Sequence, residues 1–507
     1  MLLSRNPQEL DDKYADKKRS DLRDELNELQ RLCIEENIPV LIIIEGFESS
    51  GKGYVMNELT RDLDTKYYRV KVFDDLGEAS EYDYIKKLWS SIPPYGNFHI
   101  QYRSMYTVLF NDLSSNNEAT RLRLEQVKRT EHLLYSDHHI ILKFFLDIDR
   151  KTQKKNIQGL QDDKYRSFFV TEMDANQLEH YDNYRKNISE ILTETNFEYA
   201  PWHVVTAFDN KEASRYILGA TVDHIKKEIE DIRQLRKEEA KYRYVQKKVD
   251  KSIKRLDLSK TLNDEDYNKI LSVLQDRAGE LAYQLYNEKI PTVIVFEGID
   301  AAGKGGSIRR LLRKIDPRIY DVNPTSAPSD LEKKHHYLWR FYNNLPKPGE
   351  IALFDRSWYG RILVERIEGF ANEYEWARAY QEINNMEKEL TDFGVLVLKY
   401  HLVISKDEQE RRFKEREENK PYKITDEDWR NREEWDNYIV AMDEMLQKTH
   451  TDYAPWHVIS SEDKNYARVE VLKDFIARAE LKLEEHEEDK LLIKRREKIA
   501  KESDKKD

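Results

Sequence analysis

The fold is decided by residues 290–305, IPTVIVFEGIDAAGKG. The run begins with Thr292–Phe296, a short apolar segment rich in β-branched residues, as expected for a buried parallel strand. A glycine-rich turn follows, and a helical pattern, SIRRLLRKI, covers 307–315. Strand, glycine-rich turn and helix in this order are the context in which the N–H groups of a turn bind phosphate. We therefore predict a phosphate-binding loop here.

A closely similar stretch occurs earlier in the chain. Residues 38–53, IPVLIIIEGFESSGKG, align with 290–305 at an offset of 304 − 52 = 252. Farther along, YAPWHVV at 199–205 matches YAPWHVI at 453–459, at an offset of 254. Two distant anchors at nearly one offset indicate duplication of a whole domain, because solenoid repeats have much shorter periods.

Each copy has the pattern of an α/β domain. Further strand candidates in the second copy are 351–354, 395–402 and 456–459, separated by long helical stretches. This alternation predicts a parallel sheet with helices on both faces. We expect a three-layer, P-loop kinase-like α/β fold, duplicated in tandem and carrying a helical lid. The domains are predicted to be 1–235 and 236–507, with the boundary in a charged, helix-like connector.

Composition excludes several classes of protein. The net charge of −12 argues against a general binder of nucleic acid or acidic membranes, although a local basic cleft is compatible with it. A single cysteine, Cys33, allows neither a disulfide framework nor a cysteine-based metal site. The N-terminal residues are polar, and the apolar runs are too short to cross a bilayer. We expect a cytoplasmic protein with no nucleic-acid or membrane partner.

The loop departs from the usual nucleotide-hydrolase pattern at its last position. Gly305 stands where a Ser or Thr hydroxyl would bind Mg²⁺, so another group must hold the metal. Asp300 lies inside the loop, and Asp355 ends the apolar run 351–354; both are hard oxygen ligands. We expect Mg²⁺ between these carboxylates, with Lys304 reaching the transferred phosphate. The predicted phosphate contacts in the loop are Gly298, Ala301, Ala302, Gly303, Lys304, Gly305 and Gly306.

Basic residues follow the loop in two groups. The first, Arg309, Arg310, Arg313 and Lys314, forms one face of a helix. The second precedes ENKPYKIT and consists of Arg411, Arg412, Lys414 and Arg416. That second segment has the pattern of a lid helix and loop that close arginines over a developing negative charge. We therefore add Arg309, Arg310, Arg411 and Arg416 to the predicted phosphate contacts.

Together these residues resemble the polyphosphate kinase 2 family. The motifs that carry the resemblance are GIDAAGKGG (298–306), APSDLEKKHHYLWRFYNNLP (327–346), GEIALFDRSWYGR (349–361) and SKDEQERRFKER (405–416). The resemblance implies that Asp300 and Asp355 bind Mg²⁺ and that Lys304 and Arg356 contact phosphates. It also implies a lid arginine among Arg411, Arg412 and Arg416, of which we assign Arg412 as catalytic. Arg361, at the end of the third motif, joins the phosphate contacts.

The fused arrangement is similar to the branch of this family that moves the terminal phosphoryl group of inorganic polyphosphate to AMP, giving ADP. Alternatives are a family member with another acceptor, including one that forms ATP, and an ATP-dependent P-loop nucleotide kinase. A non-catalytic regulator is the alternative from a different class. Aromatic residues of HHYLWRFY (335–342), or Trp358 and Tyr359, are candidates for stacking on the acceptor base.

The first copy has lost most of this chemistry. Lys52 matches Lys304, but Glu48 replaces Asp300, and Tyr102 aligns with Asp355. A phenol cannot replace a carboxylate as an Mg²⁺ ligand at neutral pH. We expect this copy to bind phosphate poorly and to act as a built-in partner, so that one chain forms a pseudo-dimer. Further self-association stays open.

Overall fold

A computed structural model describes residues 3–4, 7, 10, 13–73, 81–113, 118–419, 421–424 and 426–503. The chain divides into two compact units. Unit 1 comprises Met1–Lys241 with Ser329–Trp339, and unit 2 comprises Tyr242–Pro328 with Arg340–Asp507. The expected division after residue 235 falls inside the helix Asn210–Glu239 and stays a prediction.

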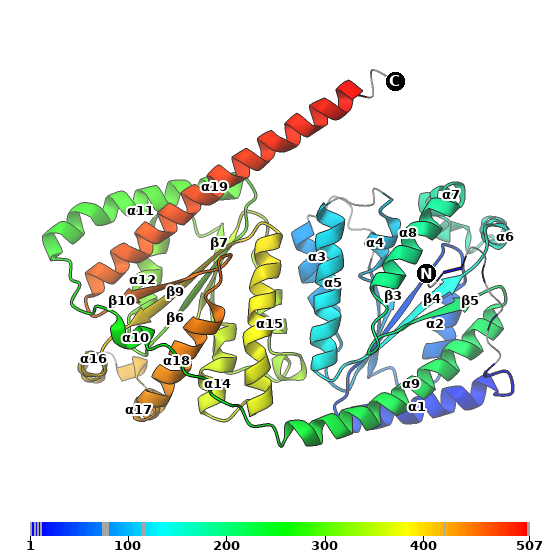
Figure 1. Cartoon of the computed structure of the whole chain (residues 1–507), viewed down its shortest axis with the longest axis horizontal. Helices are drawn as coiled ribbons and strands as arrows, with labels where there is room; N and C mark the ends of the chain where they lie inside the picture. Colours follow the sequence, from blue (N-terminus) through cyan, green and yellow to red (C-terminus); the bar gives the residue numbers. More distant parts are fainter. Residues whose placement is uncertain are drawn as a thin grey trace. The chain divides into compact units, whose positions relative to one another are not determined.

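Unit 2 is built on a five-stranded parallel sheet with the order β10-β9-β6-β8-β7 (Figure 1). The strands are β6 (Thr292–Gly298), β7 (Tyr320–Pro324), β8 (Ile351–Asp355), β9 (Leu396–Val403) and β10 (Trp456–Ser460). All of them except β7 coincide with apolar runs predicted from sequence. Strand β7 lies at the edge and leaves much of its surface exposed, so it carries no apolar signal.

Helices cover both faces of this sheet, as the sequence predicts. Helix α19 packs against α11 and α12 on one side, and α15 packs against β9 and α18 on the other (Figure 1). Asn263 caps α11, and Asn372 begins α15 with a capping box that includes Glu375. The helices of unit 2 are α10 (Ser252–Arg255), α11 (Asp264–Asn287), α12 (Lys304–Leu311), α13 (Trp339–Asn343, which begins on the last residue of unit 1), α14 (Val364–Ile367), α15 (Glu373–Asp392), α16 (Lys406–Asn419), α17 (Asp426–Glu433), α18 (Trp435–Thr449) and α19 (Lys464–Ser503).

Unit 1 repeats this sheet with the order β2-β3-β1-β4-β5. Its strands are β1 (Val40–Gly46), β2 (Tyr68–Val72), β3 (Phe98–Tyr102), β4 (Ile140–Asp147) and β5 (Trp202–Thr206). Its helices are α1 (Arg19–Glu35), α2 (Lys52–Thr60), α3 (Glu81–Ser90), α4 (Thr107–Asn111), α5 (Glu118–Ser136), α6 (Arg150–Gln161), α7 (Glu172–Glu179), α8 (Tyr181–Glu194) and α9 (Asn210–Glu239). The duplicated three-layer α/β fold is therefore confirmed.

A buried polar network that includes the tryptophan of the YAPWHV sequence is present in both copies. In unit 2, Lys399 donates to Glu387 at 2.7 Å and to the carbonyl of Thr449 at 2.7 Å, and the Trp456 ring lies beside its ammonium. In unit 1, Lys143, Glu131, Thr195 and Trp202 repeat these contacts. Because a buried charge is tolerated only when it is paired and hydrogen-bonded, this network is a requirement of the core.

Strand β6 lies at the centre of its sheet and delivers the loop to the carboxyl edge. Phe296 pairs with Asp355 of β8 on one side and with Tyr400 of β9 on the other. Ligands of open parallel sheets bind at this edge. The loop and Asp355 therefore lie next to each other, as the sequence predicts.

Candidate active site

The phosphate loop turns sharply at two glycines. Gly298 has φ +136°, and a Cβ built there would lie 2.2 Å from the carbonyl oxygen of Leu402. Gly303 has φ +100° and immediately precedes α12, whose first residue is Lys304. Positive φ and close backbone approach both favour glycine. The loop therefore places the amino end of α12, with its free N–H groups, at the carboxyl edge of the sheet.

A cavity of about 540 Å³ opens at this loop. Eight of its lining residues are basic and four are acidic, on a chain whose net charge is −12. It brings together Asp300, Ala301, Gly303, Lys304, Gly305, Gly306, Arg309, Arg310, Asp355, Arg356, Arg412 and Arg416 from the predicted set. Its other lining residues are Ser307, Glu415, Asn419, Asp428, Ser461, Lys464 and Arg468. The excess of positive charge suits an anionic ligand.

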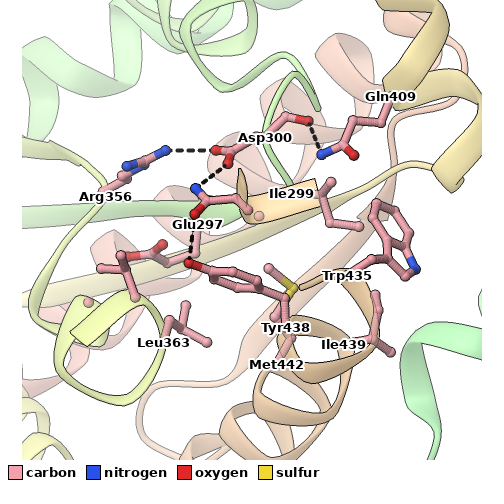
Figure 2. Close-up of a pocket in the computed structure, with 14 residues that line it drawn as sticks. Glu297, Ile299, Asp300, Arg356, Leu363, Gln409, Trp435, Tyr438, Ile439 and Met442 are labelled. Carbon is pink, nitrogen blue, oxygen red and sulfur yellow. Dashed lines mark hydrogen bonds and ion pairs between the residues drawn. The ribbon is translucent and has the colours of Figure 1, made fainter. Parts of the chain in front are cut away.

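Asp300 is held as an ionised carboxylate. Arg356 donates to it at 2.7 Å, and Asn431 of α17 donates to its other oxygen at 3.0 Å (Figure 2). Burial raises the pKa of Asp300, but the charges of Arg356 and Lys304 more than offset burial, so the pKa lies below its usual value. Asp300 is therefore charged at neutral pH.

Asp355 presents a different environment. It lines the same cavity, and its carboxylate makes no hydrogen bond or ion pair with any residue in the described ranges. Those ranges contain no group of three or more His, Cys, Asp or Glu side chains that could hold a metal ion. Mg²⁺ in phosphoryl-transfer sites is commonly held by one or two carboxylates together with substrate phosphates and water. The pair of Asp300 and Asp355 fits that ion.

The turn after β8 is fixed by a buried glutamate. Glu297 accepts hydrogen bonds from the backbone and hydroxyl of Ser357, each at 2.8 Å. Arg356, between Asp355 and Ser357, has φ +64°, so the anchored turn directs its side chain to Asp300. Glu45 accepts from Ser104 in the same way in unit 1. This anchor is common to both copies. The carboxylate that the arginine of the turn contacts differs between them: it is Asp300 in unit 2 and Glu48 in unit 1.

Lys304 is available for an anion. Its ammonium donates to the carbonyl of Gly298 at 2.9 Å and makes no ion pair with a described carboxylate. The first copy differs: Lys52 is only 3% exposed, donates to Gly46 and Phe47 at 2.9 and 3.0 Å, and lies 3.6 Å from Glu48. The additional methylene of Glu48 thus brings a carboxylate to the lysine, and burial removes that lysine from solvent.

The lid arginines have three different environments. Arg412 is buried and donates to the carbonyls of Ala301 at 3.0 Å and Ser461 at 2.7 Å. Arg411 is 60% exposed, pairs with Glu408 at 2.7 Å and does not line the cavity. Arg416 lines the cavity. Arg412 therefore lines the cavity and also braces the loop through these two hydrogen bonds, and its assignment as the catalytic lid arginine stays a prediction.

Two groups of predicted residues lie outside this cavity. Arg361 is paired with Glu365 at 3.2 Å and lines no part of the cavity. Trp358 and Tyr359 are fully buried in the core, so neither can stack on a base. Trp358, Tyr359 and Arg361 all follow the FDR sequence closely along the chain. They belong to the 3₁₀ turn Trp358–Ile362, which directs them away from the loop.

An apolar pocket that the sequence does not predict lies beside Asp300 (Figure 2). Its volume is about 60 Å³. Its apolar and aromatic side chains come from the phosphate loop, from the start of α14 and from α18: Ile299, Leu363, Val364, Trp435, Tyr438, Ile439 and Met442. The Tyr438 hydroxyl donates to Asn431 at 3.1 Å, and Asn431 donates to Asp300. A hydrogen-bonded path thus joins this pocket to the loop.

Lys464 and Arg468 are further cavity residues that sequence reasoning missed. Both come from the first turns of α19, far from the loop in sequence. Their spacing of four residues just after a strand was the available signal, since it places both on one helix face.

The described residues contain no helix long and apolar enough to span a bilayer.

Comparison with known proteins agrees with this geometry. The family model "Polyphosphate kinase 2 (PPK2)" matches residues 9–234 and again 261–487. A polyphosphate:AMP phosphotransferase of Pseudomonas aeruginosa is 35% identical over 470 residues, covering 89% of this chain and 93% of the relative. A protein of the same name from Pseudomonas syringae pv. tomato is 34% identical, and the match covers 86% of this chain and 89% of the relative. The crystal structure of a polyphosphate kinase 2 from Pseudomonas aeruginosa superposes with a TM-score of 0.80 at 32% identity, over 95% of this chain and 98% of that one. The chain belongs to the polyphosphate kinase 2 family.

Proposed function

We propose that this protein transfers the terminal phosphoryl group of inorganic polyphosphate to AMP, giving ADP. The observation that carries the proposal is the basic cavity at the loop, where Lys304 faces an open space beside Asp300 and Asp355. Relatives that match almost the whole chain are named for this reaction. Phosphoryl transfer asks mainly for positioning and charge stabilisation, which this cavity provides.

The donor phosphate would bind at the amino end of α12. Loop N–H groups and Lys304 orient it, and Arg416 faces it from the lid helix. Arg356 holds Asp300 ionised and directed at the cavity. Asp300 and Asp355 would hold Mg²⁺, which when bound neutralises charge on the reacting phosphates.

The acceptor would enter from the side of the apolar pocket. Its base packs against Trp435 and Tyr438, which places its phosphate toward Asp300 and Arg356. The pocket is smaller than a nucleobase, so side chains from α18 move when the acceptor binds. This assignment replaces the aromatic candidates from the sequence, which are part of the core or of unit 1.

Unit 1 acts as a built-in partner without catalysis of its own. Lys52 is buried against carbonyls and Glu48, and Tyr102 stands where Asp355 is needed. One active cavity per chain follows.

A direct assay tests the function. The protein is incubated with Mg²⁺ and polyphosphate and offered AMP, ADP or GMP separately, and products are separated by chromatography. ADP formed from AMP without ATP is the expected result. Phosphorylation that requires ATP would identify an ATP-dependent kinase and overturn the proposal.

A further inference from the structure

One asparagine of α17 contacts both the apolar pocket and the phosphate loop. Asn431 is only 8% exposed. Its Nδ2 donates to Asp300 Oδ2 at 3.0 Å, and its Oδ1 accepts from the Tyr438 hydroxyl at 3.1 Å (Figure 2). Tyr438 forms part of the pocket wall. A single buried side chain therefore joins a predicted Mg²⁺ ligand to the wall of the pocket.

The chemistry of the two partners sets the orientation of this amide. An ionised carboxylate only accepts hydrogen bonds, so Asp300 requires the NH₂ end of the Asn431 side chain. The oxygen end then faces Tyr438, whose hydroxyl donates to it. Hydroxyl, amide and carboxylate thus form a directional path. A movement of Tyr438 displaces the donor from which Asp300 Oδ2 accepts.

Two donors hold the two oxygens of Asp300 separately. Arg356 donates to Oδ1 at 2.7 Å, and Asn431 donates to Oδ2. Each carboxylate oxygen has a further lone pair, which stays available to a cation. Hydrogen-bond partners of a metal-binding carboxylate orient it toward the metal. The position of Asn431 therefore determines how the Asp300 carboxylate is turned about its contact with Arg356.

Both neighbours of this asparagine fasten α17 to the elements around the site. Arg430 pairs with Glu368, next to the end of α14, at 3.3 Å. Arg432 donates to the side-chain oxygen of Gln409 at 3.2 Å, and Gln409 donates to the Asp300 carbonyl at 3.2 Å. The last turn of α17 is thus held at the loop, so the short path from pocket to carboxylate has a fixed support.

The first copy provides an internal comparison. At the offset of 254, Asn431 corresponds to Gln177, and Tyr438 corresponds to Tyr184. Gln177 accepts from the backbone N–H of Glu48 at 2.6 Å, and the Tyr184 hydroxyl is bonded to other side chains. Among the residues described in unit 1, no hydrogen bond joins these two side chains. The duplicated fold therefore does not require the path, which occurs in the copy with the open loop.

We propose that Asn431 is a positioning residue that couples occupancy of the apolar pocket to the orientation of the Asp300 carboxylate. The proposal rests on the proposed function, because the occupant is the base of the acceptor. The pocket volume of about 60 Å³ is smaller than a base, so an acceptor displaces Tyr438, and the path carries this displacement to Asp300. Binding of the base then strengthens the hold of the carboxylates on Mg²⁺. The reverse effect has the same size, since coupling between two sites is reciprocal.

Adenosine is the probe for this coupling, because it carries the base without a phosphate that could itself bind Mg²⁺. In calorimetric titration of the full chain, adenosine should bind about fivefold or more tightly with saturating Mg²⁺ than in EDTA. In Asn431→Gln, Mg²⁺ should change this affinity by less than about twofold, because the path is broken. The first copy carries glutamine at this position, so the fold should be kept, which thermal unfolding checks.

A double-mutant cycle tests the path itself. Tyr438→Phe keeps the ring in the pocket wall and removes only the hydroxyl, so it should abolish the Mg²⁺ effect as Asn431→Gln does. The combined variant should lose nothing more, because both residues belong to one path. Asn437→Ala is the matched control: this exposed asparagine precedes Tyr438, bonds to Glu434 and should keep the full Mg²⁺ effect. A Mg²⁺ effect that persists in either single variant, or that is absent from the unaltered chain, would overturn the proposal.

Trp435→Ala separates this proposal from the proposed function. If adenosine binding weakens in Trp435→Ala but Asn431→Gln keeps its Mg²⁺ dependence, the acceptor pocket stands and the coupling is wrong. If the protein makes no ADP from AMP, yet Asn431→Gln abolishes the Mg²⁺ effect on adenosine, the proposed reaction fails and the coupling stands.

Discussion

The guanidinium of Arg356 lies 2.7 Å from the carboxylate of Asp300, and both residues line the same cavity. The equivalent pair in unit 1, Arg103 and Glu48, is also present at 3.1 Å. The arginine–carboxylate pair alone therefore does not distinguish the two copies. The difference is that Asp300 leaves Lys304 without an ion pair, whereas Glu48 lies near Lys52.

Arg356→Gln should make stability more sensitive to acid. The pKa of Asp300 is lowered in the folded protein, so its contribution to stability is present above the unfolded pKa and is lost as pH falls through the folded pKa. Without Arg356, burial is less opposed and the folded pKa rises, so stability is lost at higher pH. Tm measured from about pH 7 to about pH 3 checks this shift. Arg313→Gln, an exposed residue outside the cavity, is the control, and identical profiles for the two variants would contradict the expectation.

Lys304→Ala should reduce kcat for ADP formation by about 10²-fold or more, because a preorganised charge at the reacting phosphate is removed. Lys52→Ala should leave kcat unchanged, since its ammonium is bound to the carbonyls of Gly46 and Phe47. Steady-state rates of the two purified variants test this asymmetry. Equal losses would show that both copies take part in catalysis.

Asp355→Asn should abolish most activity while leaving the fold intact. Its carboxylate makes no hydrogen bond or ion pair with another described side chain, so folding loses no such interaction when the amide replaces it. The Mg²⁺ concentration for half-maximal rate should rise, because one of two hard ligands is weakened. Thermal unfolding and an Mg²⁺ titration measure the two effects. An unchanged Mg²⁺ requirement would exclude Asp355 as a ligand.

Arg412→Ala should destabilise unit 2 by about 3 kcal/mol, because buried carbonyls of Ala301 and Ser461 lose a charged donor. Its neighbour Arg411 is the matched control: exposed ion pairs contribute little, so Arg411→Ala should change stability by less than about 0.5 kcal/mol. Denaturant unfolding of both variants measures the difference. Similar values would show that Arg412 does not brace the loop.

Trp435→Ala tests the acceptor pocket. Loss of a stacking surface should raise KM for AMP about fivefold to a hundredfold and leave KM for polyphosphate unchanged. Phe370→Ala, which alters an exposed aromatic outside the pocket, serves as the comparison. A rise in KM for polyphosphate instead would place this pocket on the donor side.

The sequence by itself determined the features that depend on neighbours in the chain. The strand, turn and helix around Gly298–Lys304 and the duplication could be read because periodicity and glycine positions are local properties. The placement of Asp355 beside the loop also followed, since parallel strands bring their carboxyl ends to one edge. The edge strand β7 was not predicted from the sequence, because its exposed residues carry no apolar pattern.

Only the tertiary structure decided which basic residues face the cavity. Arg361, Arg411, Arg412 and Arg416 all belong to plausible motifs, yet only Arg412 and Arg416 line the cavity, because packing pairs Arg361 with Glu365 and Arg411 with Glu408. Lys464 and Arg468 lie more than a hundred residues from the loop and join it because α19 packs against α12. The direction of a long side chain depends on contacts between distant elements, so a charge pattern along one helix cannot determine it.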